Sequence, residues 1–432
     1  MSDSHEQRKL AILVGGGPAP GINSVIASAT IEAVNCGLHV IGLRDGFLWL
    51  VQGDTSHFVD LNIRDVSRIH FTGGSILRTS RTNPARDEQS PQRAVRALTE
   101  MGVNYLLCIG GDDTTYGAAK IAEASSGRIG VVTVPKTIDN DLPLPDNAPT
   151  FGFETARAVG TGIIESLMED ARTTGRWYLA VSMGRKSGAL ALGMCKSAGA
   201  TLAVIPEEFH VPTLDLSMVV DTIVGSIIKR QAWGRDDGVA LVAEGIAERL
   251  EPGMLERLAE SQRDAYGHVH LADVPIGSLL REQIIKTLAE VGVEATVVTK
   301  DIGYELRCAK PLPFDVEYTR TLGYGAVRYL LSGGSGALIA ISGGRVTPVS
   351  LNDLKDPETG RVRTRMVEVD TESYHVARSY MIRLEIHDFD EPMLSSLSAQ
   401  TKLTPEQFKH RFLPAVQATA PGAGHIIPVT AI

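Results

Sequence analysis

Short apolar runs alternate with stretches of helical periodicity along most of the chain. The runs end on glycine or on a charged residue: LAILV (10–14), NYLLCIGG (104–111), RIGVVTVP (128–135), WYLAVSMG (177–184), TLAVIPEE (201–208), GVALVAEG (238–245) and GALIAISGG (336–344). Continuous rather than alternating apolar strands are typical of parallel sheets that helices cover on both faces. The pattern therefore predicts an α/β, doubly wound fold, in which ligands bind beyond the carboxyl ends of the strands.

Helical periodicity follows the first run, and Gly37 is its predicted stop. The periodic positions are Ile22, Val25, Ile26, Ala29, Ala33 and Val34. A second helix is predicted over TTYGAAKIAEAS (114–125), with Thr114 or Thr115 as its cap. Residues 342–365 are predicted to be loop-rich, and SYHVARSYMIRLEIHDFDEPM and TPEQFKHRF predict helices in a C-terminal extension.

Composition excludes several classes of partner. The length of 432 residues suggests two or three domains, and a net charge of -9 without a Lys/Arg block argues against nucleic acid or an anionic membrane as partner. No apolar signal core and no run of 18 apolar residues is present, so no membrane span is expected. The four cysteines form no CxxC, and Cys36, Cys108 and Cys195 are expected to pack as small buried hydrophobes. We therefore expect a reduced, cytoplasmic protein.

Two glycine loops join a predicted strand to a predicted helix. In GGGPAPGINS (15–24), glycine N–H groups and the helix N-terminus favour an anion site, although a plain tight turn also explains the loop. The loop is neither a Walker motif, because no GK[ST] follows, nor GxGxxG, because Pro20 replaces the third glycine. In IGGDDTTYG (109–117), a single aspartate would be explained as an ordinary helix cap. Two adjacent carboxylates, Asp112 and Asp113, instead favour a Mg²⁺ ion that bridges phosphate oxygens.

The stretch PKTIDND (135–141) directly follows another predicted strand. A calcium loop is excluded because Pro143 and Leu144 stand at a ligand position and at the obligatory glycine. A surface turn explains the asparagine and aspartates, but it does not explain Lys136 and Thr137. A lysine holds a transferring phosphate as a point charge, and an aspartate accepts a proton from a substrate hydroxyl.

Further basic and polar residues follow other strands. TGGSILRTSRTNP (72–84) offers Arg78 and Arg81 for bidentate phosphate contact, and Arg78 is better explained as a solvated surface arginine. The remaining candidates, each weak alone, are Met183, Gly184 and Arg185, Glu244, and Tyr304 with Arg307. The eleven histidines show no metal-ligand spacing.

Taken together, these motifs resemble the phosphofructokinase family. The match runs in order through GGGPAPGIN, GGSILRTSR, GGDDT, PKTIDND, TFGFETA, MGRKSGALAL, IPEE, AEG and GYELR, and it ends near residue 340. The resemblance implies two Rossmann-like domains with the active site in the cleft between them. We expect a phosphoryl-donor domain of residues 1–150 plus about 300–345, a sugar-phosphate domain of 151–299, and a helical extension of 346–432 packed on the second domain.

The resemblance also implies the reaction. The 1-hydroxyl of fructose 6-phosphate attacks a terminal phosphoryl group and gives fructose 1,6-bisphosphate, a step of glycolysis and gluconeogenesis. By match of motif, Asp139 is the base, Thr137 positions the sugar, Asp112 serves Mg²⁺, and Arg185 lies near the transferred phosphoryl group. The donor-binding residues are Gly16, Gly17, Arg81, Gly111, Asp113, Thr114 and Lys136.

The sugar phosphate has its own implied contacts. Met183, Gly184 and Glu244 contact the sugar, and Arg176, Tyr304 and Arg307 hold the 6-phosphate. In relatives the Arg176-type residue comes from a neighbouring subunit, which implies a homodimer or homotetramer. One further arginine expected before GYELR is not evident, and Lys300 is the candidate substitute.

Two substitutions bear on the phosphoryl donor. Nucleotide-using relatives commonly read GGDG and, in bacterial forms, PGTIDND, whereas this chain has Asp113 and Lys136 at those glycines. A carboxylate at Asp113 would repel the α-phosphate of a nucleotide, and Lys136 adds positive charge beside a compact donor. The chain therefore resembles the pyrophosphate-dependent phosphofructokinases, whose reaction is readily reversible.

Several alternatives stay open at this point. They are an ATP-dependent phosphofructokinase that tolerates Asp113, a non-catalytic regulatory subunit of the same family, and another sugar phosphate such as sedoheptulose 7-phosphate as co-substrate. The TIDND and MGR motifs argue against an NAD kinase, and the failed GxGxxG argues against a Rossmann dehydrogenase. The intact Asp112, Asp139 and Arg185 argue against a decayed site.

Overall fold

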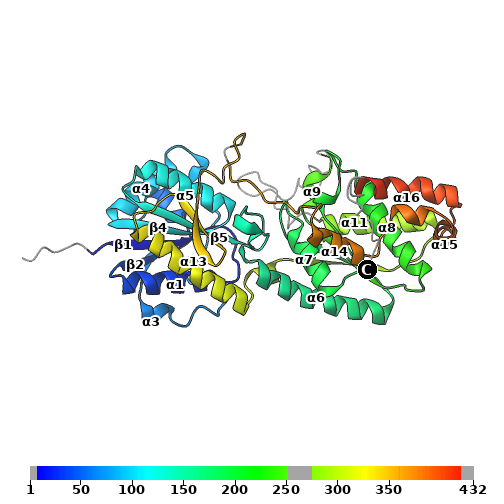
Figure 1. Cartoon of the computed structure of the whole chain (residues 1–432), viewed down its shortest axis with the longest axis horizontal. Coiled ribbons are helices and arrows are strands. Elements are labelled where there is room, and N and C mark those ends of the chain that lie inside the picture. The colour runs from blue at the N-terminus through cyan, green and yellow to red at the C-terminus, as the bar shows by residue number, and fades with distance from the viewer. Residues whose placement is uncertain (1–6, 252–274, 360, 420–432) are drawn as a thin grey trace, which may run out of the picture. The chain divides into compact units, whose positions relative to one another are not determined.

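The computed structural model describes residues 7–251, 275–359 and 361–419 (Figure 1). The chain forms two compact units. Unit 1 contains Met1–Ala156 and Tyr304–Arg365, and unit 2 contains Arg157–Gly303 and Met366–Ile432. The first passage of the chain between them falls within helix α6 (Phe153–Thr174).

Unit 1 is built on an eight-stranded sheet. Its order is β12-β11-β5-β4-β1-β2-β3, with β6 paired to β5. The strands are β1 (Lys9–Val14), β2 (His39–Leu43), β3 (Phe58–Leu61), β4 (Val103–Gly110), β5 (Gly130–Thr137), β6 (Phe151–Gly152), β11 (Ala337–Ser342) and β12 (Arg345–Ser350). All pairs are parallel except β2–β3 and β11–β12 at the two edges.

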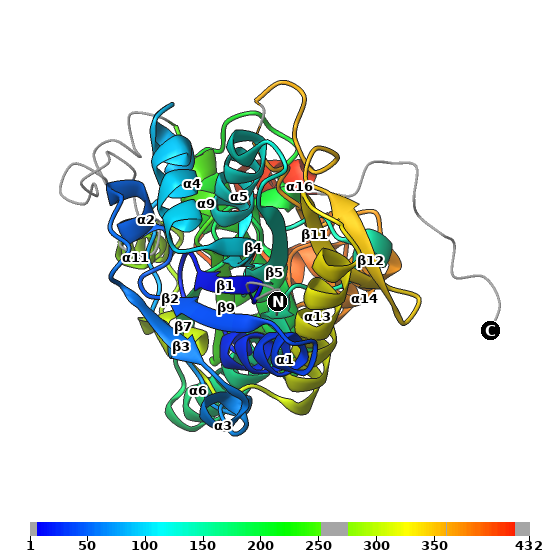
Figure 2. The same cartoon turned by 90° about the vertical axis from the view of Figure 1, so that its left-hand side faces the viewer.

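Helices cover both faces of this sheet. One face packs against α1 (Ile22–Asn35) and α13 (Pro313–Leu331), and the other against α2 (Leu48–Gln52), α4 (Ser90–Glu100) and α5 (Asp112–Ser125) (Figures 1 and 2). Successive residues of β1 serve the two cores in turn, since Leu10 and Ile12 join the first and Ala11 and Leu13 the second. Burial on both faces is the reason that LAILV is apolar throughout.

Unit 2 contains a four-stranded, all-parallel sheet of order β10-β7-β9-β8. The strands are β7 (Trp177–Ser182), β8 (Leu202–Val204), β9 (Gly238–Ala243) and β10 (Val297–Ile302). Its helices, besides most of α6, are α7 (Ala189–Ala198), α8 (Leu216–Ala232), α9 (Ile246–Arg249), α11 (Ile276–Val291), α14 (Glu372–Tyr380), α15 (Met393–Ser398) and α16 (Pro405–Thr419). Unit 2 also contains the short helices η3 (Pro206–Glu208) and η5 (Ile386–Phe389). The short helices of unit 1 that are not yet named are α3 (Ile63–Val66), η1 (Pro84–Arg86), η2 (Pro145–Asn147) and α12 (Tyr304–Arg307). The α/β class with mainly parallel sheets is confirmed.

Buried ion pairs attach the C-terminal helices of unit 2 to the rest of the unit. Arg383 donates from Nη1 to both carboxylate oxygens of Glu208 at 2.9 Å, and both side chains are almost fully buried. Lys229 of α8 likewise donates to Asp388 at 2.6 Å. Because removing one partner would leave a buried charge uncompensated, these pairs fix how the C-terminal segment lies on the unit.

Two local expectations were wrong, and one strand was not expected. Residues 342–365 are mostly loop, but they also contain the strand β12, which pairs antiparallel with β11 at an edge of the sheet. Helix α5 begins at Asp112 with Gly111 as its N-cap and has no side-chain cap, so neither Thr114 nor Thr115 caps it. Cys36 is exposed at the C-terminal end of α1, whereas Cys108 and Cys195 are buried as expected.

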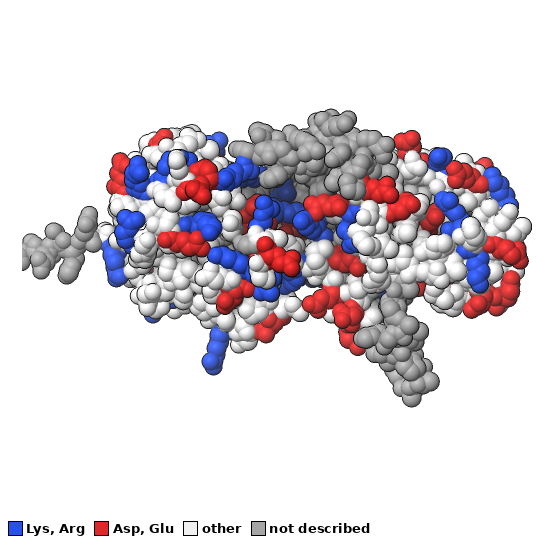
Figure 3. Space-filling view, turned by 90° about the horizontal axis from the view of Figure 1, so that it is seen from above, with Lys and Arg blue, Asp and Glu red and all other residues white. Residues whose placement is uncertain are grey.

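Charged side chains of both signs are interspersed over the face of the molecule in view in Figure 3. Within the part of the chain that the structure describes, no helix is long and apolar enough to cross a membrane.

Candidate active site

The glycine loop that follows β1 is hydrogen-bonded to two neighbouring segments of unit 1, one at Ile109 and one at Ser80. Gly15 donates its N–H to the carbonyl of Ile109 at 2.9 Å, and Gly16 donates to the carbonyl of Ser80 at 2.8 Å. Thr79 donates from Oγ1 back to the carbonyl of Gly16 at 2.5 Å. The loop that carries Arg81 therefore runs alongside the glycine loop, as a shared phosphate site would require.

Thr114 explains why the loop needs glycine at residue 15. A Cβ on Gly15 would lie 2.4 Å from Oγ1 of Thr114, and one on Gly110 would lie 2.2 Å from its Cβ. Real Cβ contacts are never so close. The side chain of Thr114 is buried, and it is fixed between the ends of β1 and β4 rather than at the helix cap.

The first turn of α5 presents two carboxylates at the end of β4. Asp112 is half-buried and Asp113 is exposed, and Asn83 donates from Nδ2 to Asp113 at 3.5 Å. The N–H groups of a helix first turn point toward its N-terminus, which favours anions there. The same turn thus offers N–H donors for phosphate and carboxylates for a cation.

The PKTIDND segment is buried, although it is rich in polar and charged residues. Lys136, Thr137, Asp139 and Asp141 are exposed by only 4%, 8%, 5% and 6%. Nζ of Lys136 donates to the carbonyl of Gly17. Oγ1 of Thr137 accepts the N–H of Asp139 at 3.0 Å, which fixes the turn around the aspartate. A surface turn is excluded by this burial, and Lys136 is brought to the glycine loop.

Arg307 lies beside the same loop. A Cβ on Gly17 would be 3.5 Å from Cζ of Arg307, and the Arg307 guanidinium is 5.2 Å from the ring centroid of Tyr304. Both residues belong to α12 of unit 1, and the Tyr304 side chain is exposed. Two cationic side chains of this unit, Lys136 and Arg307, therefore lie beside Gly17.

Unit 2 contributes a loop that follows β7. Met183 is buried and donates its N–H to the carbonyl of Ile302 at 2.9 Å. Oε1 of Glu244 accepts the N–H groups of Gly184 at 3.0 Å and of Arg185 at 2.7 Å. Arg185 has a positive φ of 51°, a conformation that two donated N–H bonds help to hold. Glu244 therefore orders the loop that carries Arg185.

Glu207 holds the other end of this loop. Its Oε1 accepts the N–H of Gly188 at 2.9 Å and of Val367 at 3.0 Å. Burial raises the pKa of this carboxyl, and the two backbone bonds oppose the shift. Sequence patterns pointed to IPEE only as part of the family match, and no local signal indicated Glu207 as a loop anchor.

Arg176 and Lys300 also belong to unit 2. Arg176 immediately precedes β7, and its Nε is 3.9 Å from Asp170, with the arginine side chain 36% exposed. Lys300 lies within β10 and is exposed. The roles of Arg176 and Lys300 stay predictions.

The residues fit a phosphate-bridged magnesium ion. Among the described residues, no group of three His, Cys, Asp or Glu side chains could hold a metal by itself. Asp112 and Asp113 supply hard oxygen ligands beside a loop built for phosphate, and Mg²⁺ characteristically combines one or two carboxylates with phosphate oxygens and water.

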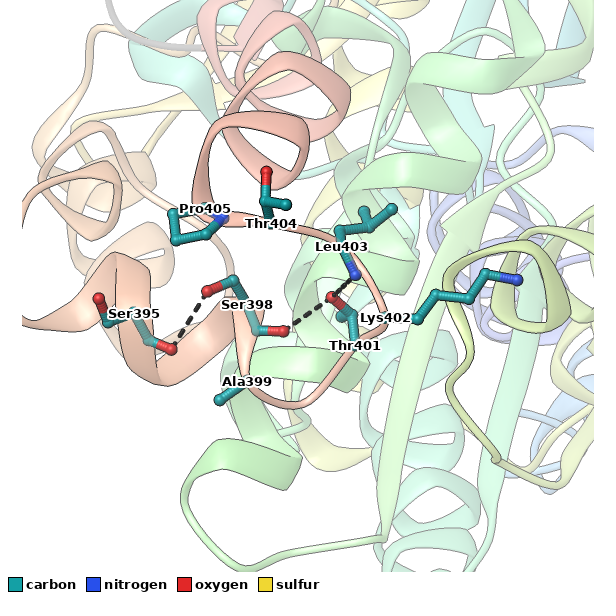
Figure 4. Close-up of a pocket in the computed structure, with 8 residues that line it drawn as sticks. All are labelled: Ser395, Ser398, Ala399, Thr401, Lys402, Leu403, Thr404 and Pro405. Carbon is teal, nitrogen blue, oxygen red and sulfur yellow. Dashed lines mark hydrogen bonds between the residues drawn. The ribbon is translucent and has the colours of Figure 1, made fainter.

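An open groove elsewhere in unit 2 contains none of these residues. It is lined by the turn between α15 and α16, from Ser395 to Pro405 (Figure 4). Its hydroxyls are used locally, since Ser398 donates to the carbonyl of Ser395 at 3.2 Å and Thr401 to that of Ser398 at 2.8 Å. The groove therefore offers no catalytic chemistry.

Glycine loops beside the buried Lys136 and Asp139, in an α/β fold, are typical of a phosphotransferase. The family model for phosphofructokinase matches residues 9–330. The chain belongs to the phosphofructokinase family.

Individual relatives agree with this assignment. A protein of Thermotoga maritima named pyrophosphate–fructose 6-phosphate 1-phosphotransferase is 52% identical over 410 residues, which cover 94% of this chain and 98% of the relative. A protein of the same name from Naegleria fowleri is 48% identical, covering 94% and 96%. The fold is shared with a solved structure, titled pyrophosphate-dependent phosphofructokinase from Nitrosospira multiformis, at a TM-score of 0.65, 16% identity and 92% coverage of each chain.

Proposed function

We propose that this chain transfers a phosphoryl group from inorganic pyrophosphate to the 1-hydroxyl of fructose 6-phosphate, reversibly, giving fructose 1,6-bisphosphate and phosphate. The observation that carries the proposal is the buried lysine, threonine and aspartate of PKTIDND, joined to a glycine loop by Lys136. Relatives that are 52% and 48% identical over most of the chain are named for this reaction.

The donor is held by residues of unit 1. The N–H groups of Gly17 and Gly111 and the side chains of Arg81 and Thr114 bind its oxygens, and Lys136 neutralises the transferring group. Gly16 shapes this loop, because its own N–H is donated to the carbonyl of Ser80. Asp113 lies where a nucleotide would need space for its α-phosphate, so its carboxylate repels the longer donor. Pyrophosphate, which ends at its second phosphorus, avoids this repulsion.

The acceptor is activated by Asp139. The carboxylate accepts the proton of the 1-hydroxyl as the oxygen attacks phosphorus, while Thr137 positions the sugar. Arg185 stabilises the charge on the transferred group, and phosphoryl transfer depends chiefly on such positioning and neutralisation. The phosphoryl bond to the sugar oxygen forms as the bond to the leaving phosphate breaks, and the proton stays on Asp139 until it passes to solvent.

The sugar phosphate has two sets of proposed contacts. Met183, Gly184 and Glu244 contact the sugar, and Arg176, Tyr304 and Arg307 bind the 6-phosphate. The position of Arg307 beside Gly17 supports a second role next to the donor loop. Lys300 is the candidate to replace the arginine expected before GYELR.

Asp112, with Asp113 close by, would hold magnesium against the donor oxygens. When bound, the ion supplies charge neutralisation for the developing phosphate. The enzyme's location in the cytoplasm, and its assembly as a homodimer or homotetramer with Arg176 reaching a neighbouring subunit, are parts of the same proposal. Light scattering of the purified protein tests the assembly, and a monomer that is fully active would contradict it.

Replacement of Asp139 tests the catalytic assignment. Asp139→Asn removes the base but keeps the size and shape of the side chain, so kcat should fall by about 10²–10⁴-fold. The measurement is the initial rate of fructose 1,6-bisphosphate formation, with circular dichroism and the melting temperature as checks of folding. A folded variant with wild-type kcat would show that another group takes the proton.

A further inference from the structure

A buried aspartate can act as a base only if its loop holds it in place. Asp139 is followed by Asn140, whose φ is 56°, in the left-handed region that asparagine adopts more readily than other non-glycine residues. Asn140 is held by contacts from Thr150 and from Arg365, which lies 225 positions away in the chain.

Arg365 makes most of these contacts. Its Nε donates to the main-chain carbonyl of Asn140 at 2.9 Å, its Nη2 donates to Oδ1 of Asn140, and its Nη1 donates to the carbonyl of Ala148 at 2.9 Å. The backbone N–H of Arg365 donates to the carbonyl of Asp141 at 2.7 Å. The planar fork of the guanidinium thus joins both ends of the 140–148 loop, which an ammonium group could not do.

Thr150 makes two further hydrogen bonds that hold the loop around Asp139. It is fully buried, its N–H donates to Oδ1 of Asn140 at 3.1 Å, and its Oγ1 donates to the carbonyl of Thr137 at 2.8 Å. The backbone is therefore anchored on both sides of Asp139, by Thr150 before it and by Arg365 after it. Removal of the guanidinium releases three of these anchors at once.

We propose that Arg365 is a positioning residue for the transfer reaction: it fixes the backbone at Asn140 and so aims the carboxylate of Asp139 at the acceptor hydroxyl. The inference rests on the proposed role of Asp139 as base. It gives a function to part of the segment after residue 345, which carries no family motif. In this role Arg365 acts through the loop rather than by binding substrate.

Steady-state kinetics of Arg365→Met test this inference. Misplacement of a reacting group by about 1 Å costs up to about 10²-fold in rate, so we expect kcat to fall about 10- to 100-fold. The KM values for pyrophosphate and fructose 6-phosphate should change by less than about threefold, because the donor and sugar contacts remain. Arg365→Lys keeps the charge without the fork and should recover only a small part of kcat.

Arg363→Met is the matched control. Arg363 comes from the same segment, is exposed, and donates from Nη2 to the carbonyl of Asp353 at 2.7 Å, so its loss should leave kcat unchanged. If Arg365→Met does not fold, Arg365→Lys carries the same two readouts. A rise in KM at constant kcat, or full recovery of kcat by lysine, would overturn the positioning role.

The double variant separates this inference from the proposed function. With Asp139→Asn in place there is no base to aim, so adding Arg365→Met should lower the remaining kcat by less than about twofold. If the two losses multiply instead, Arg365 does not act through Asp139, and the inference fails. If Asp139→Asn alone keeps wild-type kcat, the base assignment fails whatever Arg365 does.

Discussion

Replacement of Gly15 by alanine should destabilise the protein through one identifiable clash. The new Cβ would lie 2.4 Å from Oγ1 and 3.0 Å from Cγ2 of Thr114. Thr114 cannot move aside, because it is buried, stiff at χ1, and also packed against Gly110. Overpacking of this kind typically costs about 1–3 kcal/mol, and we expect Gly15→Ala to lose that amount of unfolding free energy.

A double-mutant cycle measured by urea unfolding tests the cause. Thr114→Ala removes both clashing atoms and leaves only a Cβ at 3.2 Å, so Gly15→Ala in that background should cost less than about 1 kcal/mol. Gly37→Ala is the control: a Cβ there meets nothing within 4 Å, although φ is +80°, so its cost should be the same with or without Thr114. Equal costs of Gly15→Ala in both backgrounds would refute the packing explanation.

Three further outcomes are expected. Burial raises the pKa of Asp221 to about 6, against the opposing effect of Arg411, so the folded state favours the protonated form. The contribution of Asp221 to the unfolding free energy is complete below its unfolded pKa of 3.8 and is lost as pH rises through about 6. The unfolding free energy of Asp221→Asn should therefore rise by up to about 3 kcal/mol relative to wild type between pH 4 and pH 8. A pH-independent difference in unfolding free energy would contradict this. Arg383→Met leaves Glu208 buried without its main partner, so the unfolding free energy measured in urea should fall by about 3 kcal/mol or more. A fall of less than about 1 kcal/mol would show that water or other groups replace the bond. Asp113→Gly should raise kcat/KM for ATP relative to pyrophosphate, and an unchanged ratio would mean that Asp113 does not exclude the nucleotide.

Periodicity was sufficient to predict the frame of the fold. Strands β1, β4, β7 and β9 coincide with continuous apolar runs because each is buried on both faces, which removes polar positions from the sequence. Strand β12 was missed for the opposite reason. It is a half-exposed edge strand that pairs antiparallel, and its sequence RVTPVS contains a proline, so no apolar run marks it.

The start of α5 was misjudged because capping rules favour a side chain. Thr114 and Thr115 have the right residue type for a cap, but Gly111 is the N-cap in the structure. The side chain of Thr114 instead packs between Gly15, which follows β1, and Gly110 at the end of β4. A packing role of this kind depends on three segments meeting, which local sequence rules cannot represent.

The candidate site was predictable where residues are close in the chain. Lys136, Thr137 and Asp139 lie within four residues of one another at the end of β5, where all three are buried and Lys136 is linked to Gly17. Arg365 was not predictable, since it lies 225 residues from Asn140 in a segment without apolar pattern or motif. Only the folded chain brings its guanidinium to the carbonyls of the aspartate loop.

The choice of phosphoryl donor tests the central claim most directly. The measurement is formation of fructose 1,6-bisphosphate from fructose 6-phosphate and Mg²⁺, with pyrophosphate and ATP compared at equal concentrations on the same purified enzyme. Turnover with pyrophosphate, and much slower turnover with ATP, is the predicted result, because the carboxylate of Asp113 repels the α-phosphate of a nucleotide. Equal or faster turnover with ATP would contradict the account of Asp113 and Lys136.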